Sequence, residues 1–147
     1  MKQSEEGAKT DKKKKRFIEA CCAVIERDGK ILITQRKADD TMGLHWEFPG
    51  GKIEPGESLE SCLVREIEEE INIVIRVRDF FKMIEYEYAE FRIRLHFFRC
   101  ALVSGEAEAV DCKEVRWVKP SELTQYRFPP ASSPIVSELM RTGSETF

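Results

Sequence analysis

The order of apolar and polar residues along the chain predicts strands over most of its length. Apolar, β-branched and aromatic residues dominate or alternate with polar ones in six segments, which are residues 16–26, 31–34, 73–77, 80–88, 91–102 and 115–118. Asp28-Gly29 separates the first two segments and is a strong signal for a tight hairpin turn. We expect the segments between residues 73 and 102 to pair as antiparallel hairpins.

Helical spacing replaces this pattern from Leu59 to Ile71. The apolar residues of this segment fall on one side of a helix, and Ser58 precedes it as a candidate N-cap. A further helix is predicted to start at Pro120, and another covers residues 134–141. Residues 35–52 are interrupted by glycine and proline and are predicted to be mostly loop, with a short extended piece at residues 46–48.

The charged residues are distributed unevenly. The formal net charge is −3 over 147 residues, and the first sixteen residues carry seven basic and three acidic side chains, which leaves −7 on the remainder. We predict a disordered basic tail at residues 1–15 and one domain over residues 16–147. The run Lys12–Lys15 is interpreted as a solvated terminus in preference to a contact for RNA or a membrane. An acidic domain is a poor general binder of nucleic acid and a natural host for metal cations.

Several features are typical of a cytoplasmic protein. The basic N-terminal segment has no apolar stretch of the kind found in a secretory signal, and no apolar run approaches the ~20 residues needed to cross a bilayer. The five cysteines are odd in number and have no paired spacing, so we expect reduced thiols that pack as small hydrophobes. We therefore expect a cytoplasmic location and no membrane partner.

Three carboxylates share one face of the predicted helix. Glu66, Glu69 and Glu70 stand at positions i, i+3 and i+4. Like charges at this spacing destabilise a helix by about 0.2–0.5 kcal/mol per pair, which a hard cation would offset. Oxygen ligands without nearby His or Cys favour Mg²⁺, with Mn²⁺ as the alternative. The other interpretation is a solvated acidic face on a surface helix.

The residues around these carboxylates match a longer pattern, G-x5-E-x7-R-E-U-x-E-E-x-G-U, in which U is aliphatic. The matching residues are Gly51, Glu57, Arg65, Glu66, Ile67, Glu69, Glu70 and Ile73. This stretch resembles the Nudix box. Asn72 stands where the box has its second glycine, and because Asn is the residue after Gly that best tolerates a left-handed backbone, we expect the helix to end there as usual.

The resemblance implies a fold and a set of roles. The fold is α+β, an α/β/α sandwich with a mixed sheet between helices. Its implied metal ligands are Glu66, Glu69, Glu70, the Gly50 carbonyl and Asp111. Glu57 and Arg65 are implied to brace the loop against the helix beside Gly51. A metal-bound water is implied to attack a bridging phosphorus, which metal ions assist by neutralising charge and lowering the pKa of water. For the general base, Glu66 is the first candidate, followed by Asp111 and then Glu114.

Similarity outside the box points to a branch of the family. Residues 33–36, 46–52 and 128–131 resemble the MutT branch, which hydrolyses nucleoside triphosphates, oxidised guanine nucleotides among them, to monophosphate and pyrophosphate and so cleans the nucleotide pool. The implied substrate contacts are Arg36, Glu47, Phe48 and Ser132. Phe48 could stack on a base or belong to the core. Ser132 stands where the branch has an asparagine that reads the purine edge, so base discrimination is expected to differ.

Other functions remain open on the sequence alone. The box also fits hydrolysis of another nucleoside diphosphate derivative, such as a pyrimidine triphosphate, ADP-ribose or a dinucleoside polyphosphate. A non-catalytic module that senses nucleotides or nucleic acids through the Lys run is disfavoured, because every carboxylate of the box is present. We expect a small-molecule nucleotide as the partner, no stable nucleic-acid complex, and a monomer or homodimer.

Overall fold

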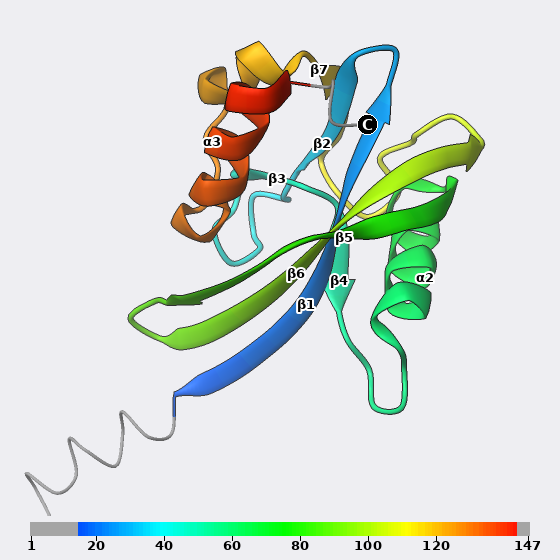
Figure 1. Ribbon diagram of the computed structural model, residues 1–147. Coiled ribbons are helices and arrows are strands. Elements are labelled where there is room, and N and C mark those ends of the chain that lie inside the picture. Colours follow the sequence, from blue (N-terminus) through cyan, green and yellow to red (C-terminus); the bar gives the residue numbers. More distant parts are fainter. Residues whose placement is uncertain (1–14, 144–147) are drawn as a thin grey trace, which may run out of the picture.

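The computed structural model describes residues 15–143, which form a mixed sheet with helices on both of its faces (Figure 1). In chain order the elements are β1 (Arg16–Arg27), β2 (Lys30–Gln35), β3 (Trp46–Glu47), β4 (Gly50–Lys52), α2 (Leu59–Ile71), β5 (Val74–Glu87), β6 (Phe91–Ser104), β7 (Glu114–Val118), the 3-10 helices η1 (Pro120–Gln125) and η2 (Pro130–Ser132), and α3 (Ser133–Thr142). None of the helices in this part of the chain is long and apolar enough to span a bilayer.

Strand β1 is the centre of the sheet. The main strand order is β3-β2-β1-β6-β5, while β4 pairs with β1 and β7 pairs with β2. β1 runs parallel to β6 and antiparallel to β2 and β4, which makes the sheet mixed. The predicted hairpin between β1 and β2 is present, with positive φ angles at both Asp28 and Gly29.

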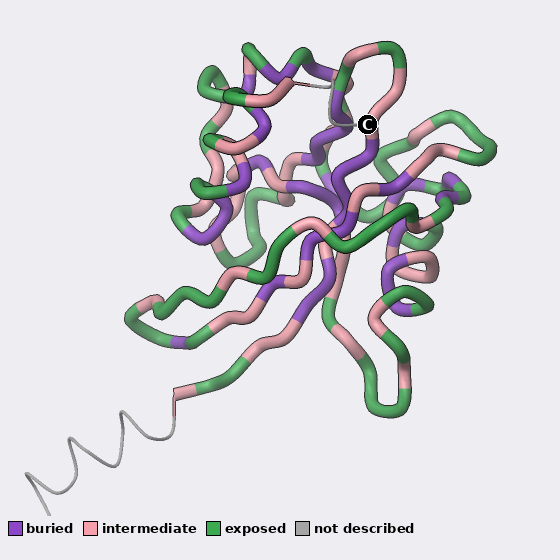
Figure 2. Tube along the Cα trace, viewed as in Figure 1, coloured by how far each residue is buried: buried purple, intermediate pink, exposed green. Residues whose placement is uncertain are grey.

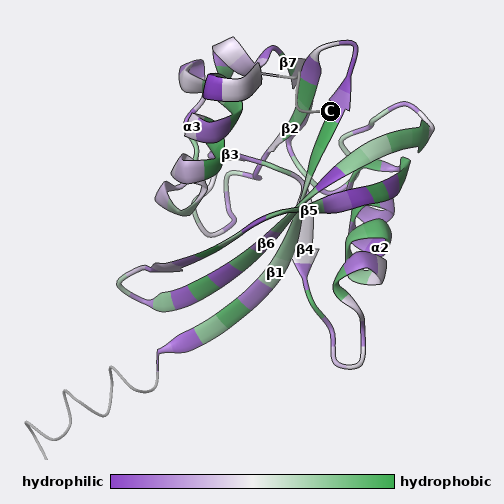
Figure 3. Ribbon diagram, in the orientation of Figure 1, coloured by the Kyte–Doolittle hydropathy of each residue, from purple (hydrophilic) through white to green (hydrophobic). Residues whose placement is uncertain are grey.

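Alternate residues of the strands supply two separate cores. Ala20 and Val24 of β1 face the layer formed by η1, η2 and α3, whereas Cys21, Ala23 and Ile25 face α2. Figure 2 shows the buried residues gathered along the middle of the sheet and on the inner sides of the helices, and Figure 3 shows the apolar residues in the same places. The predicted α+β sandwich with a mixed sheet is confirmed.

The cysteines belong largely to these cores. Cys21, Cys62 and Cys100 are almost completely buried, Cys112 is buried and Cys22 is half-buried. All five are free thiols, as expected. Burial raises the pKa of Cys21 to about 12, so its thiol stays protonated and packs as an apolar group.

Two segments differ from the prediction. The predicted strands 73–77 and 80–88 form one continuous strand, β5, whose register against β6 shifts between Val77 and Asp79 and again between Phe80 and Lys82. These irregularities interrupt the alternation of side chains, which is why the sequence resembles two strands. The predicted loop over residues 35–52 contains β4, because glycines that resemble turn signals here allow a close approach to β1.

The structure near residue 15 and after residue 118 can be compared with the predicted tail and helices. Lys15, assigned to the tail by its sequence, lies against the sheet and donates to Glu87 Oε2 at 2.6 Å. Residues 1–14 and 144–147 lie outside the described residues, so the predicted tail stays a prediction. At the other end, the expected helices begin at Pro120 and Ser133, the first as a 3-10 helix.

Helix α2 has the predicted termini. The Ser58 side chain accepts a hydrogen bond from the Ser61 N–H at 3.1 Å, as an N-cap does. Asn72 ends the helix in the left-handed conformation, with φ 59° and ψ 41°. Its side-chain amide donates to Glu108 Oε2 at 3.1 Å.

We expect Asn72→Ala to lower the free energy of unfolding by about 1–2 kcal/mol, since a left-handed backbone costs an ordinary L-residue that amount. Asn72→Gly relieves the strain but loses the Glu108 contact, so its unfolding free energy should stay within about 0.5 kcal/mol of wild type. Urea unfolding of the three proteins measures both differences. Equal loss in the two variants would show that the side-chain contact, and not the backbone conformation, stabilises the helix end.

Candidate active site

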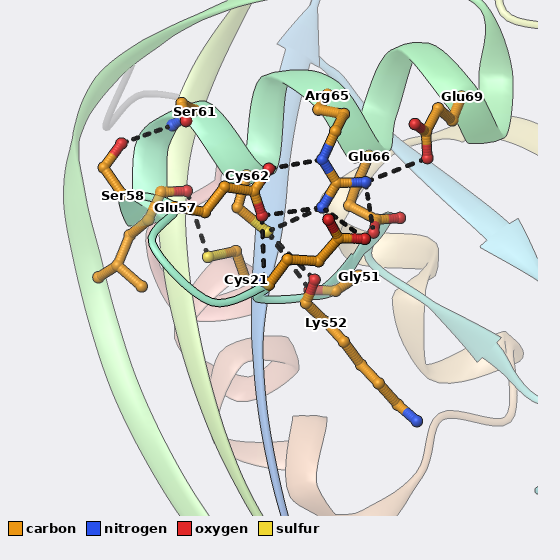
Figure 4. A network of polar contacts seen from close by, with 12 residues as sticks. Cys21, Gly51, Lys52, Glu57, Ser58, Ser61, Cys62, Arg65, Glu66 and Glu69 are labelled. Carbon is orange, nitrogen blue, oxygen red and sulfur yellow. Dashed lines mark hydrogen bonds and ion pairs between the residues drawn. The ribbon is translucent and has the colours of Figure 1, made fainter.

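A network of charged groups centres on Arg65 in the second turn of α2 (Figure 4). Its guanidinium binds both carboxylate oxygens of Glu57, through Nε and, at 2.9 Å, through Nη2. Nη1 donates to Glu66 at 3.1 Å and to Glu69 at 3.2 Å. The paired guanidinium holds the pKa of Glu57 at about 2. The network therefore ties the loop before α2 to the helix and to two of the three predicted metal ligands on it, Glu66 and Glu69.

Two glycines of β4 bring the helix and strand β1 together. A Cβ atom at Gly51 would lie 2.2 Å from the carboxylate carbon of Glu66, and one at Gly50 would lie 1.9 Å from the backbone oxygen of Cys21. The Gly50 N–H donates to Glu70 Oε1 at 3.3 Å. A side chain at Gly50 would collide with the backbone of β1, whereas one at Gly51 would displace the Glu66 carboxylate.

Glu70 differs from the other two predicted metal ligands in how its charge is balanced. Burial is the main cause that raises the pKa of Glu70, to about 8, and the neighbouring charges of Glu47, Glu66 and Asp111 raise it further, while the Gly50 N–H opposes the change. Within residues 15–143, Glu66 and Glu69 are ion-paired with Arg65 and Glu70 has no ion pair. Ionising Glu70 is thus costly in the protein alone, and a cation bound at the end of α2 would favour its charged form.

This donor set fits a hard divalent cation. The side chains that meet here offer carboxylate oxygens, which Mg²⁺ and Mn²⁺ prefer, and excess negative charge favours any cation that binds. In the described part of the chain, no three His, Cys, Asp or Glu side chains are already gathered as a complete metal-binding cluster. The predicted ligands Glu66, Glu69 and Glu70 share a helix face, but Arg65 binds two of them and the Gly50 N–H binds the third.

Asp111 and Glu114, the two acidic residues near the start of β7 that are candidate general bases, have different surroundings. The Asp111 N–H donates to the Glu70 carbonyl at 3.0 Å, and its side chain, 71% exposed, pairs with Lys37 at 2.7 Å. Glu114 begins β7 and pairs with Arg116 at 2.6 Å. The charge of Asp111 contributes to the raised pKa of Glu70, so it is the late acidic residue that lies in electrostatic reach of the carboxylate helix.

A cavity of about 280 Å³ lies on the α3 side of the sheet, next to β4. The four predicted substrate residues line it together with both glycines of β4; these are Arg36, Glu47, Phe48, Ser132, Gly50 and Gly51. Since Gly50 and Gly51 also contact Glu70 and Glu66, one short strand separates the cavity from the carboxylates. The cavity and the carboxylates of α2 therefore share β4 as a common wall.

The four predicted substrate residues differ in how they are held. Arg36 pairs with Glu47 at 3.0 Å, and burial raises the pKa of Glu47 against the opposing effect of Arg36. Phe48 is 2% exposed and its ring stacks on Phe128 at 5.1 Å, so it belongs to the core and also forms part of the cavity wall. Ser132 is 5% exposed, at the end of η2.

Sequence reasoning missed most of the cavity floor. It consists of alternate residues of two parallel neighbours, with Ile18, Ala20 and Cys22 from β1 and Ile93 and Leu95 from β6. The alternation was visible in the sequence, but the parallel pairing that places the two sets side by side was not. Tyr88, in the turn after β5, also lines the cavity and had no sequence signal.

Comparison with known proteins agrees with the resemblance to the Nudix box. The model of the NUDIX domain family matches residues 20–138. The chain belongs to the Nudix family. The CTP pyrophosphohydrolase of Escherichia coli K12 is 38% identical over 125 residues, which cover 85% of this chain and 93% of that protein. The 8-oxo-dGTP diphosphatase of the same strain is 37% identical over 118 residues, covering 80% and 92%.

Solved structures of Nudix and MutT proteins have the same fold. The solution structure of the E. coli ORF135 protein superposes with a TM-score of 0.73 at 36% identity, covering 88% of this chain and 92% of that one. The MutT protein of Methanosarcina mazei Go1 gives 0.78 at 25% identity, covering 87% and 96%. The resemblance to the Nudix family and its MutT branch, first seen in the motifs, is confirmed.

Proposed function

We propose that this Nudix protein hydrolyses nucleoside triphosphates to nucleoside monophosphate and pyrophosphate with Mg²⁺, and so removes unwanted nucleotides from the pool. The observation that carries the proposal is the position of β4, which contacts the carboxylates of α2 and also lines a cavity. A nucleotide base fits an enclosed, largely apolar site, and its phosphates need the acidic, cation-binding side.

The residues divide into two groups in this proposal. Glu66, Glu69 and Glu70, with the Gly50 carbonyl and Asp111, hold the cation, which when bound neutralises phosphate charge and lowers the pKa of water. Glu66 is our first choice for the base, because its carboxylate is half-buried against Gly51 and burial raises its pKa. Asp111 is the second choice.

On the cavity side, Arg36 contacts the substrate phosphates or base, and Ser132 reads the base edge. Glu47 orients Arg36 through their ion pair. Phe48 contributes an apolar wall, since its ring is already stacked on Phe128. These roles require the substrate to enter base first, with its phosphates left at β4.

Two classes of nucleobase are candidates for the substrate. Oxidised purine nucleotides are the first, by similarity to the 8-oxo-dGTP diphosphatase. Pyrimidine triphosphates are the second, favoured by similarity to the CTP pyrophosphohydrolase and by Ser132, which offers one hydroxyl in place of an amide.

A panel of CTP, dCTP, dGTP and 8-oxo-dGTP with Mg²⁺ tests the proposal, with pyrophosphate and phosphate release scored separately. We expect pyrophosphate as the product, and no turnover after chelation of the metal. Release of single phosphates, or turnover that persists in chelator, would contradict the proposed reaction. The nucleotide with the highest kcat/KM decides between the two bases.

We expect Ser132→Asn to raise the preference for 8-oxo-dGTP over dGTP. An amide has its donor and its acceptor on two separate atoms and can pair two atoms of a base edge, whereas a hydroxyl has both on one oxygen. One neutral hydrogen bond contributes about 0.5–1.5 kcal/mol, so the ratio of kcat/KM values should change roughly 2- to 13-fold. An unchanged ratio in a folded, active variant would place base selection elsewhere, with Arg36 the next residue to test.

A further inference from the structure

The turn that carries Ser132 lacks one of its own backbone hydrogen bonds. In η2, Ser132 N–H donates to the Pro129 carbonyl at 2.9 Å, and Pro130 has no N–H to satisfy. Ala131 N–H is therefore the remaining donor at the start of this helix, and Ala131 is only 3% exposed. Its acceptor is the Tyr88 hydroxyl, at 3.0 Å, from a residue 43 positions earlier in the chain.

We propose that Tyr88 is a positioning residue for base selection, which acts by fixing the Ala131–Ser132 turn over the substrate cavity. The inference rests on the proposed function and assigns a specificity role to a residue outside the Nudix box. Tyr88, Ala131 and Ser132 all line the same cavity. A buried N–H without an acceptor is costly, so the turn keeps its place only while the hydroxyl is present.

Tyr88 is itself held firmly enough to serve as an anchor. Its N–H donates to the Phe91 carbonyl at 2.8 Å, which closes the turn between β5 and β6. Its ring lies 4.6 Å from that of Tyr86 and 4.9 Å from that of Phe91, measured between centroids. Lys15 Nζ donates to the Tyr88 carbonyl at 3.0 Å. The backbone N–H, the carbonyl and the ring of Tyr88 are thus each held by contacts other than the one its hydroxyl makes with Ala131.

The contacts of Tyr88 lie apart from the charged network. Its hydroxyl is bonded to η2, on the α3 side of the sheet, whereas Arg65 and its carboxylates belong to α2 on the other side. Loss of the hydroxyl should therefore disturb how a base is bound and leave the chemistry at the phosphates in place. This separation predicts an effect on KM and on base preference, with little effect on kcat.

The test is Tyr88→Phe, which keeps the ring and removes the hydroxyl. Tyr86→Phe is the matched control, because Tyr86 has the same ring contact with its neighbour and lines no part of the substrate cavity. For CTP, dCTP, dGTP and 8-oxo-dGTP we expect Tyr88→Phe to raise KM roughly 2- to 13-fold, unequally among the bases, with kcat within about twofold of wild type. Tyr86→Phe should change neither quantity.

A double-mutant cycle with Ser132→Ala tests whether Tyr88 affects base selection through Ser132. If Tyr88 acts through the turn, Tyr88→Phe should have little further effect on base preference once Ser132 has lost its hydroxyl. Additive effects would overturn the inference, as would a Tyr88→Phe variant with unchanged KM and preference, or with kcat lowered equally for all four nucleotides.

Equilibrium binding of the same four nucleotides without metal separates the two proposals. Wild-type protein that binds the nucleotides without metal but does not hydrolyse them once Mg²⁺ is added would refute the proposed function, while the dissociation constants of Tyr88→Phe would still decide the role of Tyr88. Selective weakening would support that role, and equal binding by wild type and Tyr88→Phe would refute it.

Discussion

Glu70→Gln is expected to abolish metal-dependent turnover. An amide keeps the shape of the side chain but removes the charge that attracts a hard cation, at the carboxylate that has no ion pair within residues 15–143. Residues that merely support metal ligands cost about 10- to 100-fold when changed, so losing a direct ligand should exceed about 100-fold in kcat. Glu69→Gln should have an effect of the same kind.

Glu68→Gln is the control for these variants. Glu68 lies on the same helix and is exposed, and it stands about 200° around the helix from Glu70, so the turnover of Glu68→Gln should equal that of wild type. Rates are measured with saturating substrate over a range of Mg²⁺ concentrations. Near-normal kcat in Glu69→Gln or Glu70→Gln at low millimolar Mg²⁺ would remove that residue from the set of proposed ligands.

Gly51→Ala and Gly50→Ala should fail in different ways, although the two glycines are adjacent. The Cβ at Gly51 would meet the end of the Glu66 side chain, which can move aside, so the fold survives and the carboxylate is displaced. A displacement of about 1 Å can cost roughly 100-fold in rate. The Cβ at Gly50 would meet the backbone of Cys21, which cannot move without separating β4 from β1.

We therefore expect Gly51→Ala to lose about 10- to 100-fold in kcat with a melting temperature near that of wild type. Gly50→Ala should lose about 1–3 kcal/mol of unfolding free energy or more, as overpacked sites do. Thermal unfolding and turnover are measured on both variants. If the two variants lost stability and kcat to the same extent, the distinction between a structural role for Gly50 and a catalytic role for Gly51 would be wrong.

The sequence was most informative where one local pattern determines one element. The spacing of Leu63, Ile67 and Ile71 sufficed to predict α2, because a helix needs no distant partner, and Ser58 and Asn72 mark its ends. The box motif likewise predicted the family, since its residues lie within one short stretch. The hairpin at Asp28-Gly29 is another local feature.

Where distant segments meet, the sequence was insufficient. β4 was not predicted, because Gly50 and Gly51 have the composition of a turn and only the presence of β1 makes them a strand. The Tyr88 hydroxyl has no feature that distinguishes it from that of Tyr86 until η2 is placed beside it. The cavity, likewise, depends on the parallel pairing of β1 with β6, which no single segment encodes.

The chain supplies part of its own counter-charge at the acidic helix. Arg65 lies within 4 Å of carboxylates from Glu54, Glu57, Glu66 and Glu69, so the repulsion among these groups is offset by a side chain that is covalently part of the helix. The helix can consequently assemble during folding in a cell whatever the local supply of divalent ions. We expect protein depleted of divalent ions to be folded and, under the proposed metal dependence, to gain activity when the ion is supplied.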